Sequence, residues 1–226
     1  MEQKFDSKET PNKYQQAFLE SKVETNDAVV AAEVEKILKE HIAENDNKEV
    51  YQFLLNCVDL TTLSTTDSER SVAAFTKKVN DYWTNYPQYK NVAAICVYSN
   101  FAEVVRGALE VSDVNIAVCS AAFPSSQAHI ETKVAETALA IEDGADEVDI
   151  VINMGYYLDE AYEELCDEIA EIKATMGDHH LKVILETGCL KTAENIKRAS
   201  ILSMYSGADF IKTSTDKIYE GATLEA

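Results

Sequence analysis

Two lysines and two aspartates lie in short apolar segments, where packing alone would favour Val, Ile or Leu. Lys182 and Lys212 occur in LKVILET and DFIKTST, and Asp59 and Asp149 occur in LNCVDLT and EVDIVIN. Buried charges cost several kcal/mol unless they are paired, so four of them in comparable segments indicate a functional site.

These residue types favour chemistry at a carbonyl group. In a partly desolvated pocket, a lysine close to a second lysine is expected to have a lowered pKa and to offer a neutral amine as nucleophile. Its attack on a carbonyl gives an iminium, which is an electron sink for making or breaking the adjacent carbon–carbon bond. A carboxylate such as that of Asp149 can relay the protons.

The sequence predicts no metal and no cofactor. The five cysteines are scattered without a C-x-x-C pair, which favours free thiols in a reducing compartment. The histidines lie in expected helices or loops and are not predicted to be ligands or bases: His41, His129, His179 and His180. Lysines with an aspartate therefore fit a metal-free aldolase better than a hydrolase.

Short apolar runs that alternate with amphipathic stretches must position these side chains. The expected strands are 55–61, 92–98, 115–121, 147–153, 181–187 and 209–215. The expected helices between them lie near 68–83, 100–111, 126–142, 158–175 and 192–205. Such alternation predicts βαβ units and a parallel sheet. Gly-Ala-Asp, at 144–146 and at 207–209, is expected to end two of the helices, with glycine after the C-cap.

The period of two along each strand separates an inward from an outward face. Leu181, Val183 and Leu185 form an apolar face, which leaves Lys182 on the other side of its strand. The same reasoning assigns Asp59, Asp149 and Lys212 to the inward faces of their strands.

A doubly wound sheet and a (β/α)₈ barrel (TIM barrel) both fit this alternation. The first strand is followed by TLSTTD without the glycine-rich turn of a nucleotide-binding fold. Inward catalytic groups from several strands are typical of a barrel, which we therefore predict. Residues 1–50 are predicted to be a helical extension that packs on the barrel of residues 51–226, with caps at Asn26 and Asp27.

The net charge of −20 excludes classes of partner. It disfavours nucleic acids and anionic membrane surfaces, because the summed field repels polyanions. The sequence contains neither an apolar run of membrane-spanning length nor a hydrophobic signal region at MEQK, so a cytoplasmic protein is expected.

Several segments resemble deoxyribose-phosphate aldolases, which are class I aldolases on a (β/α)₈ barrel. The similar segments are Asp59–Leu63, Ala94–Tyr98, Phe123-Pro124, Gly144–Asp149, Leu181–Gly188 and Gly207–Thr215. The resemblance implies reversible cleavage of 2-deoxy-D-ribose 5-phosphate into glyceraldehyde 3-phosphate and acetaldehyde. It implies a Schiff base on Lys212, proton transfer by Asp149, and often a homodimer. It also places Asp59, Cys96 and Lys182 along the active site.

Two departures from the family pattern affect these expectations. Asp216-Lys217 follows the Lys-Thr-Ser-Thr segment where the family has Gly-Lys, so phosphate binding rests on Lys217 beside an added negative charge. Six strands are apparent, so the last two βα units of a barrel, with the second lysine that the family uses to lower the pKa of the Schiff-base lysine, are expected to be missing from these residues. The chain alone is then expected to be weakly active or dependent on a partner.

Two alternatives to the deoxyribose-phosphate reaction remain open. One is a Schiff-base aldolase or dehydratase for a non-phosphorylated substrate, which Asp216 would suit. The other is an inactive or repurposed barrel that serves as a binding or assembly module.

Overall fold

A parallel sheet forms the centre of the computed structural model, which describes residues 12–226. Its strands are β1 (Asp59–Thr61), β2 (Ala94–Tyr98), β3 (Asn115–Cys119), β4 (Glu147–Val151), β5 (His180–Ile184) and β6 (Phe210–Lys212). Each strand pairs in parallel with the next one along the chain, in the order β1-β2-β3-β4-β5-β6. This chain-order arrangement confirms the predicted barrel-type fold for six βα units.

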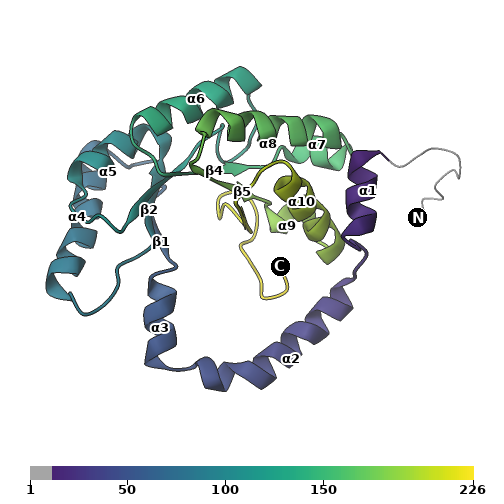
Figure 1. Cartoon of the computed structure of the whole chain (residues 1–226), viewed down its shortest axis with the longest axis horizontal. Coiled ribbons are helices and arrows are strands. Elements are labelled where there is room, and N and C mark those ends of the chain that lie inside the picture. Colours follow the sequence, from purple (N-terminus) through teal and green to yellow (C-terminus); the bar gives the residue numbers. More distant parts are fainter. Residues whose placement is uncertain (1–11) are drawn as a thin grey trace, which may run out of the picture.

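Helices follow the strands and cover the outer side of the sheet (Figure 1). They are α4 (Glu69–Asn85), the 3₁₀ turn η1 (Ser99–Phe101), α5 (Ala102–Ala108), α6 (Ile130–Glu142), α7 (Met154–Leu158), α8 (Tyr162–Met176), α9 (Thr187–Leu190) and α10 (Ala193–Tyr205). All five predicted helices are present, while the short α7 and α9 were not expected. No helix in residues 12–226 is long and apolar enough to cross a membrane.

The main core lies between the outward strand faces and these helices. The buried strand residues in it are Ile95, Val97, Ile116, Val118, Val148, Ile150, Leu181 and Val183. On the inward face, Ala94, Cys96, Ala117 and Cys119 form a separate buried cluster. The two clusters confirm the period-two assignment of faces and leave the inward face free for polar side chains.

The repeated Gly-Ala-Asp segment has the same role in both places. Gly144 and Gly207 have φ values of 100° and 103°, as expected for glycine after a helix C-cap. The aspartate that follows accepts a hydrogen bond from the first residues of a neighbouring strand: Asp146 from the Ile116 amide at 2.8 Å, and Asp209 from the Leu181 amide at 2.7 Å. The repeat therefore ends a helix and ties the loop before one strand to the strand that precedes it in the sheet.

The N-terminal residues that the structure describes are helical, as predicted: α1 (Lys13–Glu20), α2 (Asp27–Asn45) and α3 (Lys48–Leu55). Asn26 accepts a hydrogen bond from the Val29 amide and so caps α2. Helix α1 lies against α8, where Phe18 meets Tyr162 edge to face. The start of α2 lies against α10, where Asp27 accepts a hydrogen bond from the Ala193 amide at 2.8 Å. Helix α2 has no buried residue and runs with α3 on the side of the molecule opposite α6 and α8 (Figure 1). Helix α3 crosses residue 50, so the boundary proposed there stays a prediction.

All six strands are shorter than predicted, and the differences are clearest in β1, β5 and β6. Leu55 belongs to α3, and β1 begins only at Asp59. Strand β5 ends at Ile184, because Glu186 adopts a left-handed conformation with a φ of 54° and a strand cannot continue through it.

Candidate functional site

The register of the sheet brings inward side chains of different strands together. Asp149 in β4 lies opposite Lys182 in β5 and opposite Cys119 in β3. Residues in register on neighbouring strands share a face of the sheet. In β6, Lys212 pairs with Ile184, two positions beyond Lys182, and therefore projects from the same face. The predicted clustering of Asp149, Lys182 and Lys212 is thus a consequence of strand pairing.

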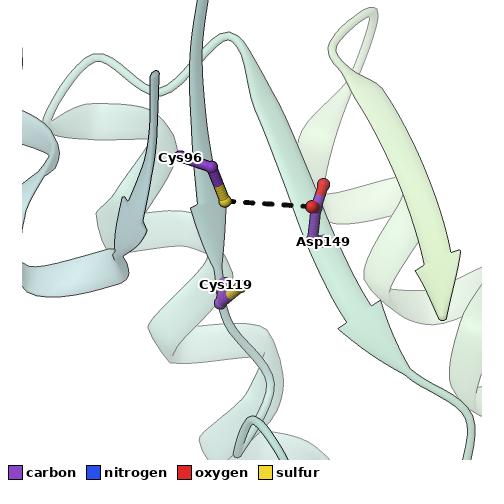
Figure 2. Close-up of side chains that lie close together, drawn as sticks. All are labelled: Cys96, Cys119 and Asp149. Carbon is purple, nitrogen blue, oxygen red and sulfur yellow. Dashed lines mark hydrogen bonds between the residues drawn. The ribbon is translucent and has the colours of Figure 1, made fainter. Parts of the chain in front are cut away.

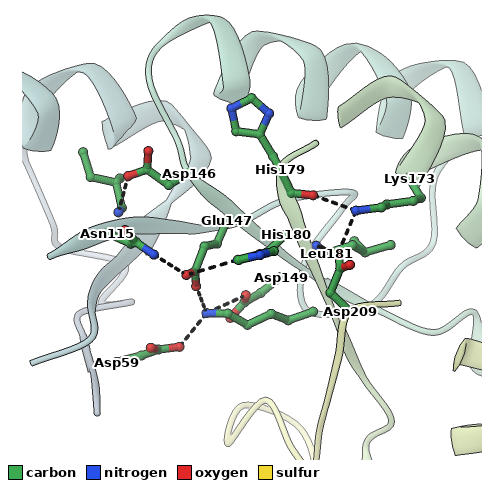
Figure 3. A network of polar contacts seen from close by, with 12 residues as sticks. Asp59, Asn115, Asp146, Glu147, Asp149, Lys173, His179, His180, Leu181 and Asp209 are labelled. Carbon is green, nitrogen blue, oxygen red and sulfur yellow. Dashed lines mark hydrogen bonds and ion pairs between the residues drawn. The ribbon is translucent and has the colours of Figure 1, made fainter. Parts of the chain in front are cut away.

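Lys182 is the centre of a network of ion pairs. Its three partners Asp59, Glu147 and Asp149 converge in Figure 3. Its Nζ lies 2.7 Å from Asp59 Oδ2 and 3.5 Å from Asp149 Oδ1, and it pairs closely with Glu147. The 3.5 Å contact counts as an ion pair, but its geometry is not that of a hydrogen bond, and Asp149 Oδ1 is a buried atom without a hydrogen-bond partner in the described structure.

Lys212 shares two carboxylates with Lys182. Its Nζ donates a short hydrogen bond to Asp149 Oδ2 and lies 3.9 Å from Asp59 Oδ2. The side chain of Lys212 is 31% exposed, whereas that of Lys182 is 7% exposed and that of Asp149 is fully buried. Of the two amines, Lys212 is therefore the one that a substrate can reach.

The pKa of Lys212 is raised, which corrects the expectation of a lowered value. Burial by itself would lower this pKa, but the charge of Asp149 and the hydrogen bond to it outweigh burial. The pKa of Lys182 is also raised, since burial is outweighed by Asp149 and by hydrogen bonds to Asp59 and Glu147. The expectation was wrong because it considered the two lysines and burial but not the carboxylates of Asp59 and Asp149 that the two lysines share.

Glu147 belongs to the site although the sequence did not single it out as a site residue. Burial would raise its pKa, but hydrogen bonds from Lys182 and Asn115 lower it overall. Its carboxylate therefore stays ionised and neutralises Lys182. Its inward position at the start of β4 was the available signal.

Lys217 lies outside this network. Its ammonium donates to the Leu63 carbonyl at 2.6 Å, in the loop after β1. The preceding Asp216 has a φ of 55°, a conformation that favours glycine, which agrees with the glycine that the resemblance places there. The structure thus brings together Asp59, Cys96, Asp149, Lys182 and Lys212, but not Lys217.

Glu186 holds the segment after Lys212 and was missed by the sequence reading. Its buried carboxylate accepts hydrogen bonds from the Thr215 amide at 3.1 Å and from the Thr215 hydroxyl at 2.5 Å. Ser214, which lies between Lys212 and Thr215 in the sequence, has a buried Oγ without a hydrogen-bond partner in the described structure.

The family is decided by a match over most of the chain. The model of the DeoC/LacD family aldolases matches residues 53–226. The chain belongs to the DeoC/LacD aldolase family. Human deoxyribose-phosphate aldolase is 35% identical over 220 residues, which cover 90% of this chain and 67% of the human protein. A relative from Caenorhabditis elegans is 40% identical over 181 residues, which cover 79% of this chain and 59% of that protein.

Two solved aldolase structures agree with the fold. The structure entitled "QR15, an Aldolase" has a TM-score of 0.66 at 29% identity, covering 76% of this chain and 72% of that one. The tetrameric deoxyribose phosphate aldolase of Aeropyrum pernix has a TM-score of 0.62 at 24% identity, covering 78% of this chain and 70% of that one. The second likeness supports the fold alone.

Proposed function

We propose that this protein catalyses the reversible cleavage of 2-deoxy-D-ribose 5-phosphate to glyceraldehyde 3-phosphate and acetaldehyde through a Schiff base on Lys212. The observation that carries the proposal is the accessible amine of Lys212 against the buried carboxylate of Asp149, in a chain of an aldolase family. Human deoxyribose-phosphate aldolase, a relative at 35% identity, supports the substrate class.

The pairing of Lys212 with Asp149 determines the first chemical step. Lys212 is held as an ammonium by Asp149, so it must lose a proton before it attacks the substrate aldehyde. The contact with Asp149 makes that carboxylate the nearest base. The protonated Asp149 then returns the proton to the carbinolamine hydroxyl, which leaves as water and gives the iminium.

The iminium then accepts the electrons of the breaking carbon–carbon bond. The hydroxyl at C3 of the sugar loses its proton, the C2–C3 bond breaks, and glyceraldehyde 3-phosphate leaves. The enamine that remains on Lys212 takes up a proton at carbon, and water releases acetaldehyde. Asp149 is the base nearest to the nitrogen in each of these proton transfers.

Lys182 serves a different purpose from Lys212. Three carboxylates surround it and its pKa is raised, so it stays an ammonium. We infer that it keeps Asp59 and Asp149 oriented. Cys96 lies 4.0 Å from Asp149 Oδ2 and lines the inward face next to the reacting atoms.

Asp216 favours a second candidate, a Schiff-base aldolase for a non-phosphorylated substrate. Lys217 would bind a phosphate, while the adjacent carboxylate would repel it by about 1 to 4 kcal/mol at a separation of about 4 Å. Comparing kcat/KM for 2-deoxy-D-ribose and for its 5-phosphate separates the candidates: a preference for the 5-phosphate supports the first, and its absence supports the second.

Borohydride trapping with acetaldehyde tests the Schiff base directly. We expect one ethyl group on the Lys212 peptide by mass spectrometry, no adduct at that position in Lys212→Met, and an unchanged adduct in Lys77→Met, which alters an exposed lysine of α4. An adduct on another lysine would contradict the assignment. Complete absence of an adduct would favour a binding or assembly module instead.

The cellular setting and the assembly follow as further parts of the proposal. The described cysteines are free thiols, which fits a reducing compartment such as the cytoplasm. A homodimer stays a prediction, and light scattering at several protein concentrations measures it.

A further inference from the structure

Three soft or anionic ligand groups meet on the inward face of the sheet. Cys96 in β2, Cys119 in β3 and Asp149 in β4 each offer one ligand atom, and these atoms lie within 4.8 Å of one another (Figure 2). All three side chains are buried. Cys96 Sγ donates a hydrogen bond to Asp149 Oδ2, and the two atoms lie 4.0 Å apart.

The strand register explains why these groups meet. Cys119 lies opposite both Asp149 and Tyr98, and Cys96 precedes Tyr98 by two residues on the same face. The neighbouring inward residues Ala94 and Ala117 are small, so they leave the two sulfur atoms free to approach each other. Leu63 and Phe123, which are partly buried, pack against this cluster.

We propose that Cys96, Cys119 and Asp149 form a binding site for a soft divalent cation such as Zn²⁺ or Cd²⁺, and that the bound cation inhibits the aldolase. Thiolates select soft metal ions, and a set of two cysteines and one carboxylate leaves the fourth tetrahedral position to water. With Zn–S near 2.3 Å and Zn–O near 2.1 Å, tetrahedral ligand atoms lie roughly 3.5 to 3.8 Å apart. The three atoms therefore need to close by about 1 Å or less.

Binding balances in charge without a redox step. The cation displaces one proton from each thiol to solvent and takes up two thiolates and one carboxylate. The resulting centre has a net charge of −1 and faces the ammonium groups of Lys182 and Lys212, which lie against Asp149. The empty site, with two neutral thiols and the Asp149 carboxylate, has the same charge of −1, so binding leaves the charge beside the two lysines unchanged.

Inhibition rests on the proposed function. The oxygen of Asp149 closest to Cys96 is Oδ2, the same atom that accepts the hydrogen bond from Lys212. A cation bound to Oδ2 withdraws the base from the lysine, so Schiff-base formation slows for as long as the cation stays bound.

Cadmium titration of the reduced protein tests the site without substrate. We expect one ion per chain by equilibrium dialysis and an ultraviolet thiolate-to-cadmium charge-transfer band. Cys119→Ser and Cys96→Ser should each weaken binding at least tenfold. Cys166→Ser removes a buried thiol of α8 and Cys57→Ser an exposed one, and both should bind cadmium as the unaltered protein does. Unchanged affinity in Cys119→Ser, or lost affinity in a control, overturns the site.

A variant could lose cadmium binding because it misfolds, so a second measurement uses the unaltered chain. Cys96 and Cys119 are buried, so they react with iodoacetamide only when the fold opens, and the assay is run in mild urea. Bound cadmium should slow alkylation of Cys96 and Cys119, and not of Cys57, as measured peptide by peptide. Equal alkylation with and without cadmium contradicts the proposal whatever the variants do.

The activity assay separates this inference from the proposed function. Cadmium should lower the rate of borohydride trapping at Lys212, and a chelator should restore it. If trapping fails without metal while the cadmium band is present, the proposed function is wrong and the site stands. If trapping occurs and cadmium at saturation leaves it unchanged, the inhibitory role is wrong.

Discussion

Replacing Asp149 by Asn removes the charge that links the two lysines while keeping the shape of the side chain. At the 3.5 Å separation of Lys182 Nζ and Asp149 Oδ1, the gross attraction is about 5 kcal/mol for an effective dielectric constant of about 20. Desolvation offsets part of this, and breaking a buried pair costs about 3 to 5 kcal/mol. We expect Asp149→Asn to lower the free energy of unfolding by an amount in this range.

The same change should lower the pKa of Lys212, because Asp149 is the main group that raises it. A lysine with a raised pKa stabilises the folded state below its unfolded pKa, and this contribution is lost as the pH rises through the folded pKa. The unaltered protein should therefore lose stability above about pH 10, and Asp149→Asn should lose less over that window. Turnover should nevertheless fall by about 10² to 10⁴, since the proton relay is absent.

Competitive labelling with acetic anhydride measures the effect on Lys212 by mass spectrometry of its peptide. The labelling profile of Lys212 should move to lower pH in Asp149→Asn and stay in place in Asp178→Asn, which alters an exposed aspartate. An unshifted profile, or one moved to higher pH, would refute the assignment of Asp149 as the group that holds the proton on Lys212.

Two further changes probe the surroundings of the site. Lys133→Met leaves Glu168 buried without the ammonium that lies 2.6 Å from it, so the free energy of unfolding in urea should fall by about 3 to 5 kcal/mol. The double variant Lys133→Met/Glu168→Leu should recover most of this loss. If it does not, the loss is not due to the unpaired charge of Glu168. Glu186→Gln weakens the hydrogen bonds to Thr215, so the free energy of unfolding should fall by about 1 to 3 kcal/mol. The kcat should also fall, while borohydride trapping at Lys212 persists. An unchanged kcat would show that this contact does not position the segment after Lys212.

Much of the fold could be predicted because strands and helices leave periodic patterns in the chain. The alternation of apolar residues located all six strands and the five main helices, and it assigned Asp59, Asp149, Lys182 and Lys212 to the inward side. The errors occurred where the backbone departs from these periods, as at Glu186, whose left-handed conformation ends β5 although the alternation of the two strand faces continues in the sequence.

The metal-ligand cluster could not be predicted in the same way. Cys96 and Cys119 occur on different strands without a local spacing motif, and only the pairing of β2, β3 and β4 brings their sulfur atoms to Asp149. A register shift of one residue would turn Cys119 to the helix side of the sheet.

The sequence by itself determined the order of the βα units and the family, and it predicted Lys212 as the reactive lysine. The tertiary structure alone decided the charge state of that lysine. The pKa of Lys212 is a sum over burial and over charges from β4 and β5, and its sign depends on distances of a few ångströms that strand register sets. For that reason the sequence predicted a lowered pKa for Lys212, whereas the structure gives a raised one.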